Sequence, residues 1–179
     1  GKKAESFELK SIENKIVSLN DVKGKNGTLI MFICNHCPYV KAVINDIVND
    51  SNILKKEGIN FVAIMSNDTK NYPDDSFENM VKFAKENHFN FPYLIDETQE
   101  IAKAYDAVCT PDFFGYNSNL ELQYRGRIRE LRELKGWSQL DLAAETGISQ
   151  TNISAIENGR VQLGKDRAIV LAEALSVHP

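Results

Sequence analysis

The sequence predicts an α/β domain followed by a small all-α domain. Residues 29–33 form an unbroken apolar run, which suits a strand buried on both faces. A Cys-x-x-Cys motif follows it, and apolar residues then recur at helical spacing from Pro38. Near residue 128 the strand patterns end and only helical spacing remains. We therefore divide the chain into residues 1–127 and 128–179.

The composition is that of an ordinary soluble globular protein. The chain has 179 residues, of which 42% are hydrophobic and 26% charged. Every apolar run is shorter than the roughly 18 residues that cross a bilayer. Three cysteines are too few for the disulfide framework of small secreted proteins. We expect a cytoplasmic protein without a membrane partner.

The charge is unevenly distributed along the chain. The net charge is −4 at pH 7, and residues 1–126 carry 14 basic against 18 acidic side chains. Residues 127–179 carry 7 of each. The second part is neutral, so it supplies little of the long-range attraction that dominates DNA affinity.

The elements of the first part follow from alternation, continuous apolar runs and helical spacing. Alternating residues predict a hairpin, continuous runs predict buried strands, and Gly58 is placed to end the long helix. In chain order we predict strands 7–12 and 16–19, a loop 21–27, strand 28–33, a helix from 38 to about 58, strand 59–65, a polar loop 66–76, helix 77–87, strand 91–96, helix 99–105, and a hairpin of strands 108–116 and 120–124.

The second part reads as four short helices. Ser138 and Ser149 are placed as N-caps, because each precedes a helical apolar pattern. Gly136, Gly147 and Gly159 are placed to end the preceding helices. The module therefore contains short helices joined by tight turns.

The Cys-x-x-Cys motif lies at the turn between the buried strand and the long helix. Free amide groups and the helix dipole favour a thiolate there, so we expect Cys34 to be the acidic nucleophile. We expect Cys37, one helical turn further on, to be more buried and to resolve the mixed disulfide. His36 lies between them and, when protonated, adds positive charge beside the thiolate. The motif predicts redox chemistry.

The same residues have other interpretations. Cys34, His36 and Cys37 are zinc-ligand types, but a closed site needs four ligands and the sequence has no second Cys-x-x-Cys or histidine pair. We therefore predict no metal and no cofactor. Cys109 is either a third redox partner or an inert buried thiol. We expect His88 to be a surface residue at a helix end.

Two separated motifs carry a family resemblance. Ile33-Cys34-Asn35-His36-Cys37-Pro38-Tyr39-Val40 and Cys109-Thr110-Pro111-Asp112-Phe113-Phe114 resemble the thioredoxin-like redoxins, within them the peroxiredoxin-like branch. The resemblance covers residues 1–127 and implies an α/β thioredoxin-like fold. It also implies that Thr110-Pro111 is a cis-proline element facing the cysteines. Catalysis would then depend on Cys34, Cys37, His36, Thr110 and Pro111. Thioredoxins carry tryptophan at the position of Ile33, and peroxidases of this superfamily carry threonine at that of Cys34.

The second part resembles another family. Its residues 138–160 are similar to the helix-turn-helix of Cro/repressor-type proteins, the Xre family, which includes antitoxin-like regulators. The resemblance covers residues 128–177 and implies that the second helix of the motif reads DNA bases in the major groove. By motif position the base readers are Gln150, Thr151 and Ser154. The expected phosphate contacts are Gln139, Ser149, Asn152, Asn158 and Arg160. Double-stranded DNA and a homodimer formed through the helical domain are the partners this implies.

Three functional hypotheses remain open. The first is a thiol-disulfide oxidoreductase domain, acting on a protein or small-molecule disulfide, fused to a sequence-specific DNA-binding module. The second is a DNA-binding transcriptional regulator or antitoxin-like protein whose redoxin half senses redox state without turnover. The third is a peroxiredoxin-like peroxidase. The two halves meet without a linker, so residues 128–135 either cover the sheet or leave it open, and a recombined or engineered fusion is one explanation of the junction.

Overall fold

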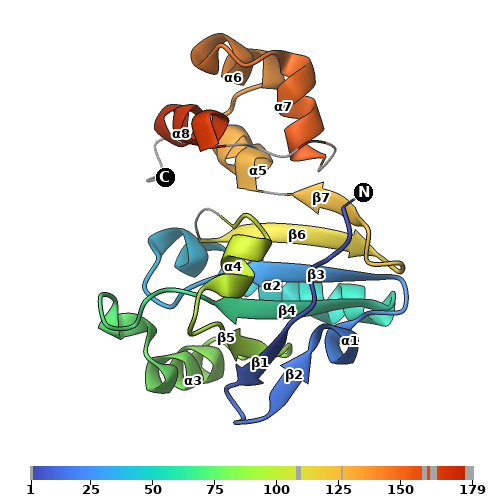
Figure 1. The fold of residues 1–179 in the computed structure, drawn as a ribbon, viewed down its shortest axis with the longest axis vertical. Helices are drawn as coiled ribbons and strands as arrows, with labels where there is room; N and C mark the ends of the chain where they lie inside the picture. The colour runs from blue at the N-terminus through green and yellow to red at the C-terminus, as the bar shows by residue number, and fades with distance from the viewer. Residues whose placement is uncertain (1, 108–109, 126, 159–160, 162–164, 176–179) are drawn as a thin grey trace.

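A seven-stranded mixed sheet organises the first part of the chain (Figure 1). The computed structural model describes residues 2–107, 110–125, 127–158, 161 and 165–175. The strand order is β2-β1-β5-β4-β3-β6-β7. The strands are β1 (Glu8–Ser11), β2 (Ile16–Ser18), β3 (Gly27–Phe32), β4 (Ile59–Met65), β5 (Tyr93–Ile95), β6 (Asp112–Asn117) and β7 (Leu122–Arg125).

Helices cover both faces of this sheet. The long α2 (Pro38–Lys56) and α3 (Phe77–Glu86) pack on one face. The short α1 (Leu19–Val22) and α4 (Glu100–Ala104) pack on the other. Each face has its own apolar cluster, and the order of elements confirms the predicted thioredoxin-like α/β fold.

The central strand β3 positions the cysteine turn. It pairs in parallel with β4 and antiparallel with β6. Met31 and Ile33 point into one apolar cluster, whereas Ile30 and Phe32 point into the other. Because the strand is buried on both faces, its continuous apolar sequence fixes where the following turn emerges.

Two short elements replace loops that we expected from the sequence. Helix α1 begins after Ser18, whose hydroxyl accepts from the Asp21 amide while the Asp21 carboxylate accepts from the Ser18 amide. This capping box and the burial of Leu19 and Val22 stabilise a helix of only four residues. The polar loop after β4 contains the 3₁₀ turn η1 (Pro73–Asp75).

The second part of the chain is a four-helix module, as predicted. Its helices are α5 (Arg127–Leu134), α6 (Gln139–Thr146), α7 (Gln150–Glu157) and α8 (Lys165–Ala174). They share an apolar cluster built on Leu142, Ile153, Ile156, Leu171 and Leu175.

Helix α5 belongs to this helical module. Ile128 and Leu131 pack against the helical cluster, so α5 does not serve as a covering helix for the sheet. Figure 1 shows it leading away from the end of β7. This decides between the two arrangements that the missing linker left open.

The predicted helix ends of the module are largely confirmed. Ser138 caps α6 in a capping box with Asp141, and the Ser149 hydroxyl accepts from the Asn152 amide at the start of α7. Gly136 and Gly147 both adopt φ +69°, a left-handed conformation that favours glycine. Gly159 lies outside the described residues.

The two parts meet at β7. Helix α7 lies against this strand, and the Arg129 guanidinium lies 5.8 Å from the centroid of the Tyr124 ring. Next to it, Arg125 faces Asp112 at 3.7 Å and donates to the Asp106 carbonyl. Within the described ranges, every helix is too short or too polar to span a bilayer.

Candidate functional site

The two cysteines lie against the Thr110-Pro111 segment. Cys34 Sγ is 3.1 Å from Thr110 Oγ1, and Cys37 Sγ donates to the Thr110 carbonyl at 3.3 Å. The Thr110-Pro111 peptide bond is cis, as the family resemblance implied. Thr110 is 76 positions from Cys34 and 73 positions from Cys37 in the sequence. The Thr110-Pro111 segment and the cysteine turn are therefore distant in sequence but form one site.

The order of burial at the cysteines is the reverse of our expectation. Both are free thiols, but Cys34 is 1% exposed and Cys37 is 9% exposed. Cys34 lies two residues after the end of β3 and follows the fully buried Ile33, whereas Cys37 is the N-cap residue of α2, with Pro38 as the first helical residue. The prediction that Cys37 is the more buried thiol is wrong.

The electrostatic environment distinguishes the two thiols in the same direction. A hydrogen bond from Cys34, aided by the amides of Val40 and Tyr39, lowers the pKa of Cys37 to about 5 against the effect of burial. The hydrogen bond to Cys37, burial and the nearby Asp75 charge raise the pKa of Cys34. The helix N-terminus thus favours a thiolate at Cys37 rather than at Cys34.

Asp75 is a buried carboxylate beside this turn. It is fully buried, and Oδ1 accepts from the Asn35 amide at 2.8 Å. Oδ2 lies 2.8 Å from His36 Nδ1 and accepts from Asn67 Nδ2 at 2.8 Å. The carboxylate therefore fixes both the backbone and the histidine ring of the Cys-x-x-Cys turn.

Further contacts hold the inner residues of the turn. Tyr93 Oη donates to Asn35 Oδ1 at 2.9 Å, and Asn35 Nδ2 donates to the Asp74 carbonyl at 3.1 Å. The His36 ring stacks on Tyr72, with centroids 5.3 Å apart and planes 5° from parallel. His36 is therefore held between a buried carboxylate and an exposed aromatic ring.

Asp75 is not among the site residues predicted from the sequence. A usable signal was present, because β3 and β4 pair in parallel and the carboxyl ends of parallel strands meet at one edge of a sheet. The loop after β4 therefore had to lie beside the turn after β3. Sequence alone did not indicate which of the acidic residues in that loop points inward.

Cys34, His36 and Asp75 form a cluster of metal-ligand types. One potential ligand atom from each lies within 4.8 Å of the other two. The Asp75 oxygens are already satisfied by a backbone amide, an Asn67 amide and the His36 ring. This donor set suits a carboxylate that positions a histidine without needing an ion.

The expected DNA readers are accessible at the start of α7. Gln150, Thr151 and Asn152 are exposed, and Ser154 is half-buried. Ser149 is exposed and caps the helix. The amino-terminal end of α7 therefore presents short polar side chains.

Other expected phosphate contacts take part in a buried cluster inside the module. Gln139 Nε2 donates to the fully buried Glu157 at 2.7 Å, and Arg132 Nε donates to the same carboxylate at 2.7 Å. Burial opposes the charge, but Arg132 and Gln139 hold the pKa of Glu157 below its usual value. Asn158 Oδ1 accepts from Arg129 at 3.3 Å. Arg160 lies outside the described residues.

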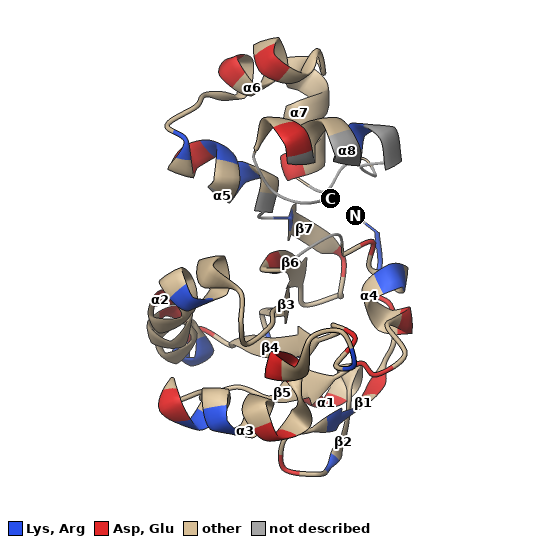
Figure 2. Cartoon of the chain, turned by 90° about the vertical axis from the view of Figure 1, so that its left-hand side faces the viewer, with Lys and Arg blue, Asp and Glu red and all other residues tan. Residues whose placement is uncertain are grey.

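The charges of the helical module differ from helix to helix. Figure 2 shows basic residues along α5 together with acidic ones, and acidic residues on α6. The sequence of α7 contains one charged residue, the buried Glu157. A DNA contact made by α7 would therefore depend on polar groups and helix amides.

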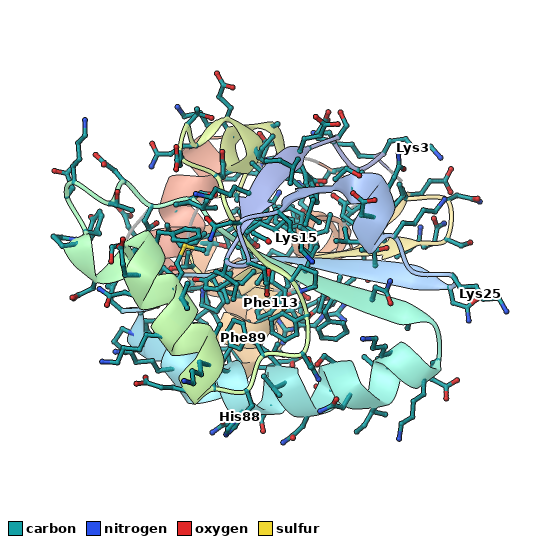
Figure 3. The ribbon with its side chains drawn as sticks, turned by 90° about the horizontal axis from the view of Figure 1, so that it is seen from below. Lys3, Lys15, Lys25, His88, Phe89 and Phe113 are labelled. Carbon is teal, nitrogen blue, oxygen red and sulfur yellow. The ribbon has the colours of Figure 1, made fainter. Side chains whose placement is uncertain are left out.

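The two remaining expectations concern His88 and Cys109. His88 is exposed just after α3, as predicted, and Figure 3 shows it at the outer margin while Phe89 and Phe113 lie inside. Cys109 lies outside the described residues.

Family comparisons agree with the two-part organisation. The model of the AhpC/TSA family matches residues 1–131, and a helix-turn-helix model matches residues 128–179. Thiol-disulfide oxidoreductase ResA of Bacillus thuringiensis is 29% identical over 117 residues, covering 64% of this chain and 61% of that protein. The chain thus spans about six-tenths of the length of the curated relatives it matches.

Solved structures share the fold. A conserved protein of Geobacillus kaustophilus is 52% identical, with a TM-score of 0.70, covering 72% of this chain and 68% of that one. A protein of Sinorhizobium meliloti is 30% identical, with a TM-score of 0.71, and the match covers 87% of this chain and 80% of that one. A secreted disulfide oxidoreductase of Mycobacterium tuberculosis is 18% identical, with a TM-score of 0.56, and the match covers 65% of this chain and 79% of that one. At this identity the match shows a similar fold alone. The chain belongs to the AhpC/TSA family of redoxins and continues into a helix-turn-helix segment of the Xre type.

Proposed function

We propose that the redoxin part catalyses thiol-disulfide exchange through Cys34 and Cys37, with Cys37 as the attacking thiolate. The observation that carries this proposal is the position of Cys37 at the N-terminus of the 19-residue α2, beside the Cys34 thiol, which donates a hydrogen bond to it. The ResA relatives support the reaction class. A thiolate with a pKa near 5 is present at neutral pH.

The exchange takes two steps. The Cys37 thiolate attacks a substrate disulfide, forming a mixed disulfide and releasing the first substrate thiolate. Cys34 then loses its proton and attacks Cys37 Sγ, which releases the second substrate thiolate and leaves a Cys34–Cys37 disulfide. Two electrons pass from the protein to the substrate, and an external thiol restores the pair.

Turnover with insulin and dithiothreitol tests this function. Each variant is made in a Cys109→Ser background, so that only Cys34 and Cys37 can react. We expect Cys34→Ser and Cys37→Ser each to abolish insulin reduction, while the background protein retains it. Turnover that survives either substitution contradicts exchange through this cysteine pair. A background protein without turnover contradicts the enzymatic proposal and favours a redoxin half that senses redox state without catalysis.

Peroxide reduction is the competing activity for the same thiolate. The AhpC/TSA match and the acidic Cys37 favour it, because peroxidases of this superfamily place their reactive cysteine at the position of Cys37. Cys34 would then resolve a Cys37 sulfenate. Hydrogen peroxide consumption measured beside insulin reduction separates the two, and we expect disulfide exchange to be faster.

We also propose that the helical module binds double-stranded DNA. The exposed side chains of Gln150 and Thr151 at the start of α7 support base reading, with the half-buried Ser154 one turn further on. Ser149, Asn152 and the helix amides would contact phosphates. Gln139 and Asn158 position α7 through the Glu157 cluster in addition.

Selection from a random-sequence duplex library tests the DNA proposal. We expect an enriched sequence whose preference is lost in the Gln150→Ala, Thr151→Ala double variant, while salt-dependent binding to other duplexes remains. Glu145→Gln, on the exposed surface of α6, is the matched control. Equal affinity of parent and double variant for the enriched sequence contradicts the assignment of these readers.

A further inference from the structure

The second step of the proposed exchange needs a base. Cys34 is 1% exposed, and in the mixed disulfide its proton has to leave before the sulfur can attack Cys37. Burial and the adjacent Asp75 charge both oppose the Cys34 thiolate. A nearby acceptor would therefore accelerate this step more than the first one.

The structure provides such an acceptor on the same turn. A ring nitrogen of His36 and a carboxylate oxygen of Asp75 each lie within 4.8 Å of Cys34 Sγ. That separation is one that a single water or a small side-chain movement bridges, and catalytic hydrogen bonds are often longer before substrate binds. His36 is about one-third exposed, so its ring can also pass a proton on to solvent.

The environment of His36 suits this task. Asp75 is fully buried and lies 2.8 Å from Nδ1, so it directs a proton to that nitrogen and leaves the other as an acceptor. The stacked Tyr72 ring and the Asp75 contact hold the imidazole in one orientation. A protonated His36 would form an ion pair with Asp75.

Resting on the proposed function, we infer that His36 accepts the Cys34 proton in the resolving step and that Asp75 positions His36 and stabilises the resulting imidazolium. The Cys34 S–H bond breaks, the proton moves to the imidazole, and the Cys34 electron pair forms the bond to Cys37 Sγ. The Cys37–substrate bond breaks, and the substrate sulfur leaves as a thiolate. The proton later passes from His36 to solvent or to that thiolate.

Among the residues that the structure describes, few other titratable groups face this cluster. Cys37, Asp75 and Tyr93 interact with Cys34. His36 contacts Asp75 and Tyr72. The Tyr93 hydroxyl is buried, with its pKa raised well above its usual value by burial and by the Cys34 and Asp75 charges, so it stays neutral throughout the working range.

Stopped-flow reaction of the reduced, full-length protein in the Cys109→Ser background with dithiobis(nitrobenzoate) tests the relay, because each step then releases one coloured thiolate. The first phase reports attack by Cys37 and the second reports resolution by Cys34. We expect Asp75→Asn and His36→Phe to slow only the second phase, by about a hundredfold. Phenylalanine keeps a ring that can stack on Tyr72 but has no acceptor, so it decides the question even when Asp75→Asn does not fold.

The pH dependence gives a readout that a purely structural role would not change. Between about pH 7 and pH 9 the rate of the second phase should depend less on pH in the parent than in the two variants, where it should rise about tenfold per pH unit as hydroxide replaces the relay. Asp74→Asn is the matched control, because it removes an exposed carboxylate from the same 3₁₀ turn. We expect both of its phases to match the parent.

Each failure has its own signature. A second phase that is unchanged in His36→Phe, or two phases slowed equally, overturns the relay while leaving the exchange reaction intact. A parent protein that releases no coloured thiolate in the first phase overturns the proposed function and the relay with it.

Discussion

Two fully buried carboxylates, Asp75 in the redoxin part and Glu157 in the helical module, have opposite kinds of partners. Glu157 accepts from Arg132 and Gln139 at 2.7 Å, with Arg129 at 3.5 Å. Arginine keeps its charge at every working pH, so the partners of Glu157 in this cluster, the Glu157 cluster, do not change their protonation. The partner, rather than the burial, therefore decides whether a buried acid is locked in one charge state or can exchange a proton with its neighbour.

Asp75 has partners of the other kind. It accepts from two amide groups and contacts one histidine, His36, whose ring can take up or release a proton, unlike an arginine guanidinium. It also lies beside a pair of thiols, one of which loses a proton in the proposed exchange. Glu157 joins α5, α6 and α7, whereas Asp75 joins the loop after β4 to the reactive turn after β3.

The largest expected effect comes from removing Arg132 from the Glu157 cluster. Arg132→Ala leaves Glu157 buried without its main partner and should destabilise the helical module by about 3–5 kcal/mol. Trp137 is the one tryptophan of the chain and packs against the module's apolar cluster, so its fluorescence during denaturant unfolding measures the loss. Thiol kinetics at Cys37 should not change.

A double replacement controls for the lost pairing. Arg132→Met combined with Glu157→Leu removes both charges and should recover most of the stability, because the cost arises mainly from an unpaired buried charge. A loss below about 1 kcal/mol in Arg132→Ala would contradict the structural role, since that is the range of exposed ion pairs.

The reactivity of the Cys37 thiol should change between pH 7 and pH 4, a range in which the Glu157 cluster should keep its charges. The pKa of Cys37 is lowered to about 5, so its thiolate is present above that pH and is lost as the pH falls through it. Alkylation of Cys37 by iodoacetamide, followed by peptide mass spectrometry, should therefore slow about tenfold between pH 7 and pH 4. A midpoint near pH 8.5, or earlier alkylation of Cys34, would show that the thiolate has been assigned wrongly.

Glu157 should produce its own pH effect at lower pH. Its pKa is depressed in the folded state, so its stabilisation is present above the unfolded value of about 4.3 and disappears as the pH falls through the folded value. Acid titration of Trp137 fluorescence should show a transition below about pH 4 that is absent in Glu157→Gln. The transition should persist in Glu145→Gln, which alters an exposed acid.

The smallest effect concerns the ends of the helices and not the buried acids. Ser138 caps α6, and Ser138→Ala should cost about 1 kcal/mol in the unfolding of the module. Ser118→Ala, in the exposed turn between β6 and β7, is the control and should be neutral. A cost comparable to that of Arg132→Ala would mean that local capping outweighs the buried cluster.

Patterns in the chain were sufficient to predict most of the fold. The continuous apolar strands, the Ser138 and Ser149 caps and the Cys-x-x-Cys turn all form as expected, because each depends on neighbouring residues. The contact between Thr110 and the cysteines was anticipated only through family resemblance, since it joins distant segments.

The features that could not be predicted from the sequence depend on three-dimensional packing. The relative burial of Cys34 and Cys37 is set by where β3 ends and where α2 begins, which spacing does not reveal. Asp75 became visible only when parallel pairing brought its loop beside His36. Gln139 was expected to contact phosphate, but its amide also donates to a glutamate that sequence gave no reason to bury.

The most direct test of the central claim is trapping of the mixed disulfide. In the Cys109→Ser background, Cys34→Ser and Cys37→Ser are each mixed with dithiobis(nitrobenzoate), and the intact mass is measured at neutral pH. We expect Cys34→Ser to form a stable adduct on Cys37 rapidly, and Cys37→Ser to react slowly. Rapid adduct formation on Cys34 in Cys37→Ser, with an unreactive Cys37 in Cys34→Ser, would contradict the assignment of Cys37 as the attacking thiolate.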